Sequence, residues 1–321
     1  MDFNDILQII ISPTTAAFAL AAIGLNFHYG LTGLLNMGHA GFMLIGMYGY
    51  GISVSHGLPA WAGLLIAILG AVLFALLLGW PTLRLRGDYL AIVTIAAAEI
   101  VRIVGRSQWL KEWTGGNTGI RGKDFKGPFE ALSPFPDQLI RIGPWQFHGS
   151  LANSWWLITV GWSLVAIFAL LFWRLKSSPW GRVMRGIRED EDAVRSLGKN
   201  VYSFKMQSLV IGGVIGALGG IVWAHANAVS PDSMGRTTTF WIWTMLLLGG
   251  AATVFGPILG TALFWALFVL IKQVAPMVFP SLQGTQVEPL ALAFVGLGLI
   301  LLIVFRPQGI LGNRREIAIN G

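Results

Sequence analysis

Long stretches of this sequence carry no formal charge, and no other feature restricts its fold as strongly. Residues 6–83 contain no Asp, Glu, Lys or Arg, and residues 206–305 contain very few. Only 12% of the chain is charged against 55% hydrophobic, whereas a soluble domain has about a quarter of its residues charged. The sequence therefore predicts an integral membrane protein.

Nine apolar runs are candidate transmembrane helices, because roughly 20 helical residues cross the hydrocarbon core of a bilayer. The runs are continuous rather than alternating, which favours helices over the strands of a membrane barrel. They cover residues 6–27, 31–54, 60–80, 89–105, 154–174, 205–228, 238–252, 257–275 and 288–305. We expect an all-α polytopic bundle of about 8–10 spans, forming a single domain over residues 1–321 in the lipid bilayer.

The placement of basic residues predicts the orientation. They gather at three places on one side of the predicted bundle: within 174–205, at Arg84 and Arg86, and at Arg306, Arg314 and Arg315. Lys and Arg are enriched in cytoplasmic loops, so we expect the N-terminus outside and the C-terminus in the cytoplasm. The net charge of +7 then reflects topology, and nucleic-acid binding is not expected. Segment 106–153, rich in Gly, Pro and aromatic residues, is predicted to be an ordered external loop.

Glycine lies inside the predicted spans, where a soluble helix would avoid it. Gly212, Gly216 and Gly220 form a tandem G-x-x-x-G, a spacing that lets helix backbones approach closely in lipid. The second span holds a similar series between Gly30 and Gly51. Such a series is typical of tight helix packing, and also of a broken span whose irregular backbone lines a cavity.

Two breaks in the predicted spans follow from this pattern. One lies near residues 36–39, and the other lies within 249–257, where Pro257 suits the first turn of a new helix. If the first break lines a cavity, four residues beside it are candidates for a translocation path: Asn36, Gly38, His39 and Gly41.

Polar side chains inside spans are costly, so each is a candidate for function. Glu99 and Arg102 are three residues apart on one helical face and are predicted to pair. His39 either lines a path or forms a hydrogen bond across helices. His225 and Asn227 are expected to be exposed at the outer end of their span. The five histidines lack the H-E-x-x-H spacing and the chain has no cysteine, so no metal site is predicted.

The segment 176–204 is predicted to be a cytoplasmic loop that carries a short amphipathic helix. Pro179 suits a helix start and Gly198 suits a C-cap, so we expect a helix within 179–198 that carries the acidic run Glu189–Asp192. A solvated connection that only orients the membrane domain is one interpretation. A docking helix explains the mixed charge and the apolar stripe better.

Five stretches, taken together and in order, resemble the LivM type of permease from ABC importers of branched-chain amino acids. They are Leu34–Phe42, Arg84–Tyr89, Thr114–Ile120, Ile187–Ala193 and Arg306–Leu311. The resemblance implies that the cytoplasmic helix docks into an ATPase subunit through a variant of the pattern E-A-A-x-x-x-G. That pattern begins here at Asp192-Ala193-Val194 and ends at Gly198.

The resemblance also implies the location, which is the bacterial inner (plasma) membrane, the contact residues and the partners. The ATPase-coupling residues are Arg188, Glu189, Asp190, Glu191, Asp192, Ala193 and Gly198. The partners are two ATP-binding subunits, which use ATP and magnesium, a second homologous permease of the LivH type, and an external substrate-binding protein.

The chain lacks the phosphate-binding loop G-x-x-x-x-G-K-[ST]. We therefore expect a transport subunit with no ATPase site, no catalytic residue and no bound cofactor of its own. Import of branched-chain amino acids is the preferred interpretation, and urea or short amides are alternative solutes for the same type of permease. An ion-coupled carrier would place carboxylates near mid-membrane, where only Glu99 qualifies. An intramembrane hydrolase would need a nucleophile motif such as G-x-S-x-G, which is absent.

Overall fold

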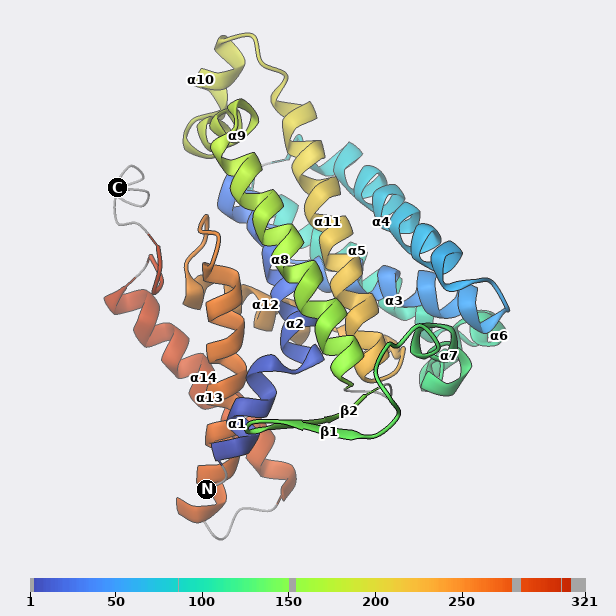
Figure 1. The fold of residues 1–321 in the computed structure, drawn as a ribbon. Coiled ribbons are helices and arrows are strands. Elements are labelled where there is room, and N and C mark those ends of the chain that lie inside the picture. Colours follow the sequence, from blue (N-terminus) through green and yellow to red (C-terminus); the bar gives the residue numbers. More distant parts are fainter. Residues whose placement is uncertain (1–2, 86, 150–153, 279–283, 307, 313–321) are drawn as a thin grey trace.

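The computed structural model is a helical bundle with one small hairpin (Figure 1). It describes residues 3–85, 87–149, 154–278, 284–306 and 308–312. Among these residues, four helices are long and apolar enough to cross a membrane, or five if one bent pair counts as a single span. The prediction of an all-α, multi-pass membrane protein is confirmed. Arg86, Arg314 and Arg315, which entered the predicted orientation, lie outside the described residues.

Each of the nine apolar runs overlaps a helix or a pair of helices. These are α1 (Phe3–Ile11) with α2 (Pro13–Leu25), α3 (His39–Ser55), α4 (Ala60–Thr82), α5 (Gly87–Arg106), α8 (Trp155–Ser177), α11 (Val201–Ala226), α12 (Arg236–Gly249), α13 (Gly256–Val278) and α14 (Gly284–Phe305). α3 and α12 have 17 and 14 residues, fewer than the roughly 20 of a typical crossing. Both adjoin a predicted break.

The remaining elements are short. They are η1 (Asn26–Leu31), η2 (Gln108–Leu110), α6 (Lys111–Thr114), η3 (Gly116–Thr118), η4 (Gly122–Asp124), α7 (Gly127–Glu130), β1 (Leu139–Ile142), β2 (Trp145–His148), α9 (Pro179–Glu189), α10 (Glu191–Ser196) and η5 (Pro231–Met234).

α2 is the central helix of the bundle, because every residue from Thr15 to Leu25 is buried. It packs against α11 through glycine. A Cβ on Gly212 would lie 2.3 Å from the carbonyl oxygen of Gly24, and one on Gly220 would lie 2.1 Å from that of Met43 in α3. The tandem G-x-x-x-G therefore brings three helix backbones into contact, as small residues do in lipid.

The glycines at the start of α3 have the same role toward α5 and α11. A Cβ on Gly38 would lie 2.0 Å from the carbonyl oxygen of Thr94, and one on Gly46 would lie 2.1 Å from that of Ala217. The predicted tight packing is thus confirmed for this series. It holds α3 between α5 and α11.

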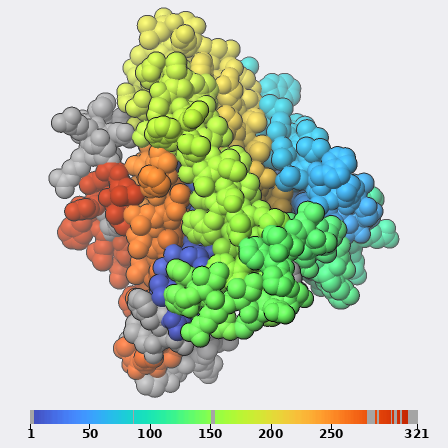
Figure 2. All heavy atoms as spheres, viewed as in Figure 1, coloured from blue at the N-terminus to red at the C-terminus, as the bar shows by residue number. Residues whose placement is uncertain are grey.

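The two ends of the bundle differ. α9 and α10 project at one end, and α6, α7 and the β1–β2 hairpin cover the other (Figure 1). Along one face, α8 runs from the α9 end down to this cover (Figure 2). The segment 106–149 is ordered, as predicted. The antiparallel hairpin within it was not predicted. The turn of that hairpin uses Gly143 at φ 61°, where glycine has no steric penalty.

Two tryptophans fasten this cover to the bundle. Trp155 Nε1 donates to the carbonyl of Ile140 at 2.9 Å, and Trp156 Nε1 donates to that of Phe129 at 3.1 Å. Both tryptophans start α8, so the cover is tied to the end of α8 that lies far from α9.

Candidate functional site

The first break, residues 26–38, separates α2 from α3 and consists of the π-helical turn η1 followed by residues 32–38. The chain passes from α2 through one π-helical turn, η1, and becomes helical again only at His39. π-helical turns are rare and are frequent at functional sites. The predicted break near residues 36–39 is confirmed.

The second break, residues 250–255, separates α12 from α13. Gly250 has φ 112°, and Ala252, at φ 60°, is the only non-glycine residue with positive φ in the described part of the chain. A left-handed backbone costs an alanine roughly 1–2 kcal/mol. Thr253 Oγ1 accepts from the N–H of Gly256 at 3.0 Å and so caps α13. The predicted bend within 249–257 is confirmed.

The described C-terminal residues, 308–312, close the end of α12. The N–H groups of Ile310 and Leu311 donate to the carbonyls of Leu248 and Gly249 at 3.1 and 2.9 Å. A helix end leaves its last carbonyls without partners in the helix. The motif at Arg306–Leu311 thus supplies donors beside the second break.

Asn26 joins the two breaks. Its Nδ2 donates to the carbonyl of Thr253 at 2.8 Å, and its Oδ1 accepts from the N–H of Ala252 at 2.7 Å. Asn26 is 1% exposed. Gly30 leaves room for this bridge, because a Cβ there would lie 2.0 Å from the Asn26 Oδ1. The two breaks are therefore one structural unit.

A buried polar cluster lies beside the first break. Asn36 Nδ2 donates to His28 Nδ1 at 3.1 Å, and the other ring nitrogen of His28 lies 3.1 Å from the carbonyl of Leu209. The His39 ring packs edge-on against His28 with centroids 5.3 Å apart. Neither ring nitrogen of His39 has a hydrogen-bond partner among the described residues. Ala21 of α2 offers His39 a backbone acceptor across helices, although the contact does not reach the geometry of a regular hydrogen bond.

The candidate path residues are enclosed in this conformation. Asn36 is 1% exposed and His39 is fully buried. Gly38 and Gly41 pack against α5, and a Cβ on Gly41 would lie 2.9 Å from that of Ala98. A solute reaches these four residues only if helices packed around α3 separate from it.

The predicted single helix over 179–198 is wrong, because the segment forms two helices. Asp190 adopts extended angles, φ −151° and ψ 103°. Its carboxylate accepts from the N–H groups of Asp192 and Ala193 at 2.9 and 3.0 Å. Aspartate is a strong N-cap, so it ends α9 at Glu189 and starts the six-residue α10.

α10 presents a charged face with one apolar side chain. Glu191 and Asp192 accept from the guanidinium of Arg195 at 2.9 and 2.8 Å, and Glu191 also pairs with Lys205. Leu197 is 78% exposed. Leu197 is the C-cap of α10, and Gly198 follows it at φ 74°, the left-handed position in which glycine ends a helix, as predicted.

The predicted coupling residues divide between this face and the interior. Glu189, Asp192 and Ala193 are exposed. Arg188 is half-buried, and its Nη1 donates to the carbonyl of Gly30 in η1 at 2.7 Å. One coupling residue thus contacts η1, the π-helical turn of the first break.

The predicted pair of Glu99 and Arg102 is confirmed at 2.6 Å. It belongs to a larger network near the C-terminal end of α5. Arg102 Nη1 also lies 2.5 Å from Asp232 Oδ1, which Arg106 approaches at 3.4 Å. Arg106 in turn donates to Asn117. Sequence reasoning found the pair one helical turn apart and missed Asp232, which is 130 residues away.

The exposure expected for His225 is wrong, because the residue is 4% exposed. The rings of Tyr50, Phe125 and Phe129 surround it with centroids 4.5–5.5 Å away. These rings come partly from the cover, which the prediction treated as separate from the spans. Asn227 is exposed, as expected. Nearby, burial lowers the pKa of Lys126, whose ammonium donates to the carbonyl of Asn227 at 2.7 Å.

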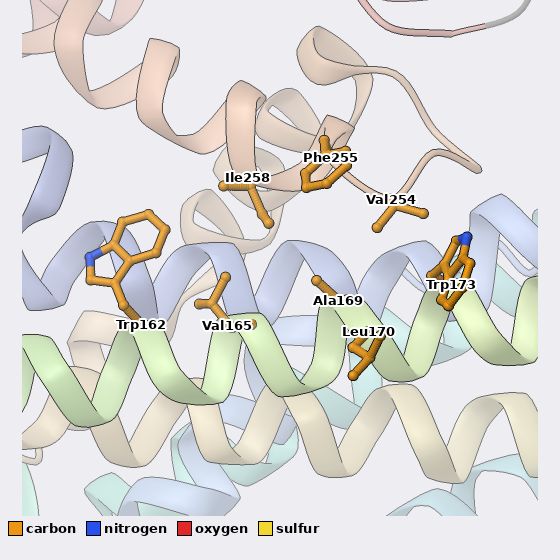
Figure 3. Close-up of a pocket in the computed structure, with 9 residues that line it drawn as sticks. Trp162, Val165, Ala169, Leu170, Trp173, Val254, Phe255 and Ile258 are labelled. Atoms are coloured by element: carbon orange, nitrogen blue, oxygen red, sulfur yellow. The ribbon is translucent and has the colours of Figure 1, made fainter.

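A groove of about 560 Å³ lies between α8 and the second break (Figure 3). Trp162, Val165, Ala169, Leu170 and Trp173 face it from α8, and Val254, Phe255 and Ile258 face it from the other side. Its lining is almost wholly apolar. Such a lining offers no partner to a carboxylate or an ammonium group, so the groove is a poor site for a zwitterion.

Comparison with known families matches residues 8–304 to the family described as "Branched-chain amino acid transport system / permease component". The chain is 32% identical over 315 residues to the high-affinity branched-chain amino acid transport system permease protein LivM of Escherichia coli K12, with 95% of this chain and 70% of the relative covered.

Two further relatives extend the likeness. The probable branched-chain amino acid transport permease protein LivM of Methanocaldococcus jannaschii is 24% identical, with 92% of this chain and 91% of the relative covered. The high-affinity permease protein LivH of Escherichia coli K12 is 25% identical, with 93% of this chain and 92% of the relative covered. The similarity thus spans nearly the whole chain, including both breaks and the α9–α10 segment.

Proposed function

The chain belongs to the branched-chain amino acid transport permease family, and from that premise we propose that it is the LivM-type membrane subunit of an ABC importer that carries leucine, isoleucine and valine inward. Its helices form half of the conduit, and the energy comes from other subunits. The family match over residues 8–304 is the observation that carries this proposal.

The proposed assembly has two ATP-binding subunits, a second permease and an external substrate-binding protein. The likeness to LivH over 93% of this chain supports pairing of two related permeases, because related subunits can pack around a shared pseudo-symmetry axis. ATP and magnesium act in the ATP-binding subunits, since this sequence has no phosphate-binding loop.

The ATP-binding subunits are proposed to dock on α10 and on the end of α9 beside it. Asp192 and Ala193 are exposed there, together with Leu197. Protein interfaces commonly have an apolar anchor at the centre and a polar rim. Leu197 and the charged side chains of α10 have this composition. The alternative is a solvated connection, which would tolerate charge reversal.

The translocation path is proposed to run beside the first break, along Asn36, Gly38, His39 and Gly41. An amino acid is a zwitterion, and moving it through hydrocarbon without polar partners is very costly. Irregular backbone within a membrane can supply such partners where it lines a cavity. His39 supports this choice, because both its ring nitrogens are buried without partners among the described residues.

The proposed orientation places α10 in the cytoplasm and segment 106–153 outside. Because the chain has no cysteine, Leu197→Cys and Trp109→Cys each create a unique labelling site; the native side chains are 78% and 96% exposed. In membrane vesicles, a membrane-impermeant maleimide should label Leu197→Cys only from the cytoplasmic side and Trp109→Cys only from the outside. Labelling of Leu197→Cys from the outside would refute this topology.

Copurification from the native membrane tests the assembly. A tagged chain should bring down an ATP-binding subunit and a second permease. The external binding protein of the same system should bind leucine, isoleucine and valine more tightly than urea or acetamide. Preference for urea or a short amide would contradict the proposed solute but not the assignment as a permease. The absence of any ATP-binding subunit would refute the assembly.

A further inference from the structure

Two basic side chains from the α8–α9 segment reach the two breaks directly. Arg188 in α9 donates to the carbonyl of Gly30 at 2.7 Å, although the residues are 158 positions apart. Lys176, in the last turn of α8, donates to the carbonyl of Ala252 in the second break. Each cation therefore contacts a backbone carbonyl of η1 or of the second break.

The end of α8 and the start of α9 are held together closely. Ser178 caps α9 by accepting from the N–H of Gly181 at 3.3 Å, and its hydroxyl donates to the carbonyl of Leu175 at 2.7 Å. A Cβ on Gly181 would lie 2.3 Å from that same carbonyl oxygen. Such close backbone contact leaves little freedom at the joint, so a force on α9 displaces the last turn of α8 as well.

The other side of this connection is also joined. Asn26, through its bonds to Ala252 and Thr253, links η1 to the second break. Arg188, Gly30, Asn26, Ala252 and Lys176 therefore form a closed ring of contacts between the surface helix and both breaks. Hydrogen bonds from a charged donor are about twice as strong as neutral ones, which suits contacts that must carry a displacement.

We propose that Arg188 is a positioning residue for transport: it transmits movement of α9 to η1 and, through Asn26, to both breaks, with Lys176 as the second contact. This rests on the proposed docking of ATP-binding subunits at α10. The ring couples the two breaks, so they shift together. The α8–α9 segment acts on the backbone carbonyls of Gly30 and Ala252, and both lie where regular helix geometry is already interrupted. A displacement there breaks no hydrogen bonds of a regular α-helix.

The test uses the complete transporter in vesicles and measures solute carried per ATP hydrolysed. Arg188→Gln removes the charged donor, Arg188→Lys keeps a cationic donor, and Arg182→Gln removes the same charge from an exposed position on α9. Arg188→Gln should lower the ratio about tenfold, as expected for loss of one charge-assisted hydrogen bond, while ATP hydrolysis continues. Arg188→Lys should recover part of the ratio, and Arg182→Gln should leave it unchanged.

An unchanged ratio in Arg188→Gln, or an equal fall in Arg182→Gln, would overturn the proposal. Hydrogen exchange of the detergent-purified chain gives a second measurement that needs no transport. Arg188→Gln should speed exchange at residues 26–33 and 250–255 and leave α4 unchanged, whereas uniform or absent change would contradict the ring. If the wild-type complex carries no branched-chain amino acid, the proposed function fails, but the exchange result still decides whether the ring exists.

Discussion

Replacing Asp192 and Ala193 together with arginine is expected to abolish ATP-driven uptake and leave the membrane domain folded. Both residues are exposed on α10, and the pair that Asp192 makes with Arg195 lies at the surface, where its loss costs at most about 1 kcal/mol. The change removes one negative charge, adds two positive charges beside Arg195 and replaces the small side chain of Ala193 by a long one. Like charges brought together at a docking contact weaken association by several kcal/mol, and the longer side chain also prevents close approach.

Uptake and ATP hydrolysis by the reconstituted complex measure this effect. Uptake should fall more than tenfold, and the thermal midpoint of the isolated chain should remain within a few degrees of the wild type. Asp192→Asn is the matched control, because it removes one charge without adding bulk or repulsion, and it should retain most of the uptake. Full coupling in the double arginine variant would refute docking at α10.

Replacing Arg102 with methionine is expected to destabilise the membrane domain by about 2 kcal/mol, the usual cost of losing hydrogen bonds to a charged group. Arg102 donates to both oxygens of Glu99 and also to Asp232, and its side chain is only 19% exposed. Without it, the partly buried carboxylate of Glu99 loses its closest cation and, among the described residues, keeps only the more distant Arg236. A carboxylate in such a place is costly unless it is paired.

The control for this change is Arg106→Met. Arg106 contacts Asp232 at the longer distance of 3.4 Å, and its side chain is 47% exposed, so its loss should cost less than about 1 kcal/mol. Thermal unfolding of both variants in the same detergent compares them. Adding Glu99→Gln to Arg102→Met should restore part of the stability, and equal midpoints for the two single variants would show that the network contributes nothing.

Local sequence signals predicted much of this architecture. Apolar runs gave the helices, since length and hydropathy act within one segment. The break near His39 and the bend at Pro257 were predicted from glycine and proline, whose backbone effects are also local. The pairing of Glu99 with Arg102 follows from helix geometry alone.

Contacts between distant segments were not predictable in this way. Arg188 meets Gly30 across 158 positions, and Asn26 meets Thr253 across 227. Nothing in one sequence shows which carbonyl a long cationic side chain will reach. Asn26 precedes a run of glycine and aromatic residues and offered no signal of its own, although a buried amide at a helix end must find partners.

Two errors have instructive causes. The acidic run after Arg188 looked like the face of one helix, but an aspartate within it can cap a new helix, and Asp190 does so. His225 lies at the end of a span and was expected to meet water. Instead, aromatic rings of the cover bury it, because segment 106–149 packs onto the spans.

The energy source of uptake is the most direct test of the whole account. Radiolabelled leucine uptake is measured in vesicles that contain the complete complex, with trapped ATP and with ionophores that collapse proton and sodium gradients. We predict uptake that needs ATP and the ATP-binding subunits and that persists when both gradients are abolished. Accumulation of leucine by the purified chain alone, or loss of uptake on addition of the ionophores at unchanged ATP, would contradict it.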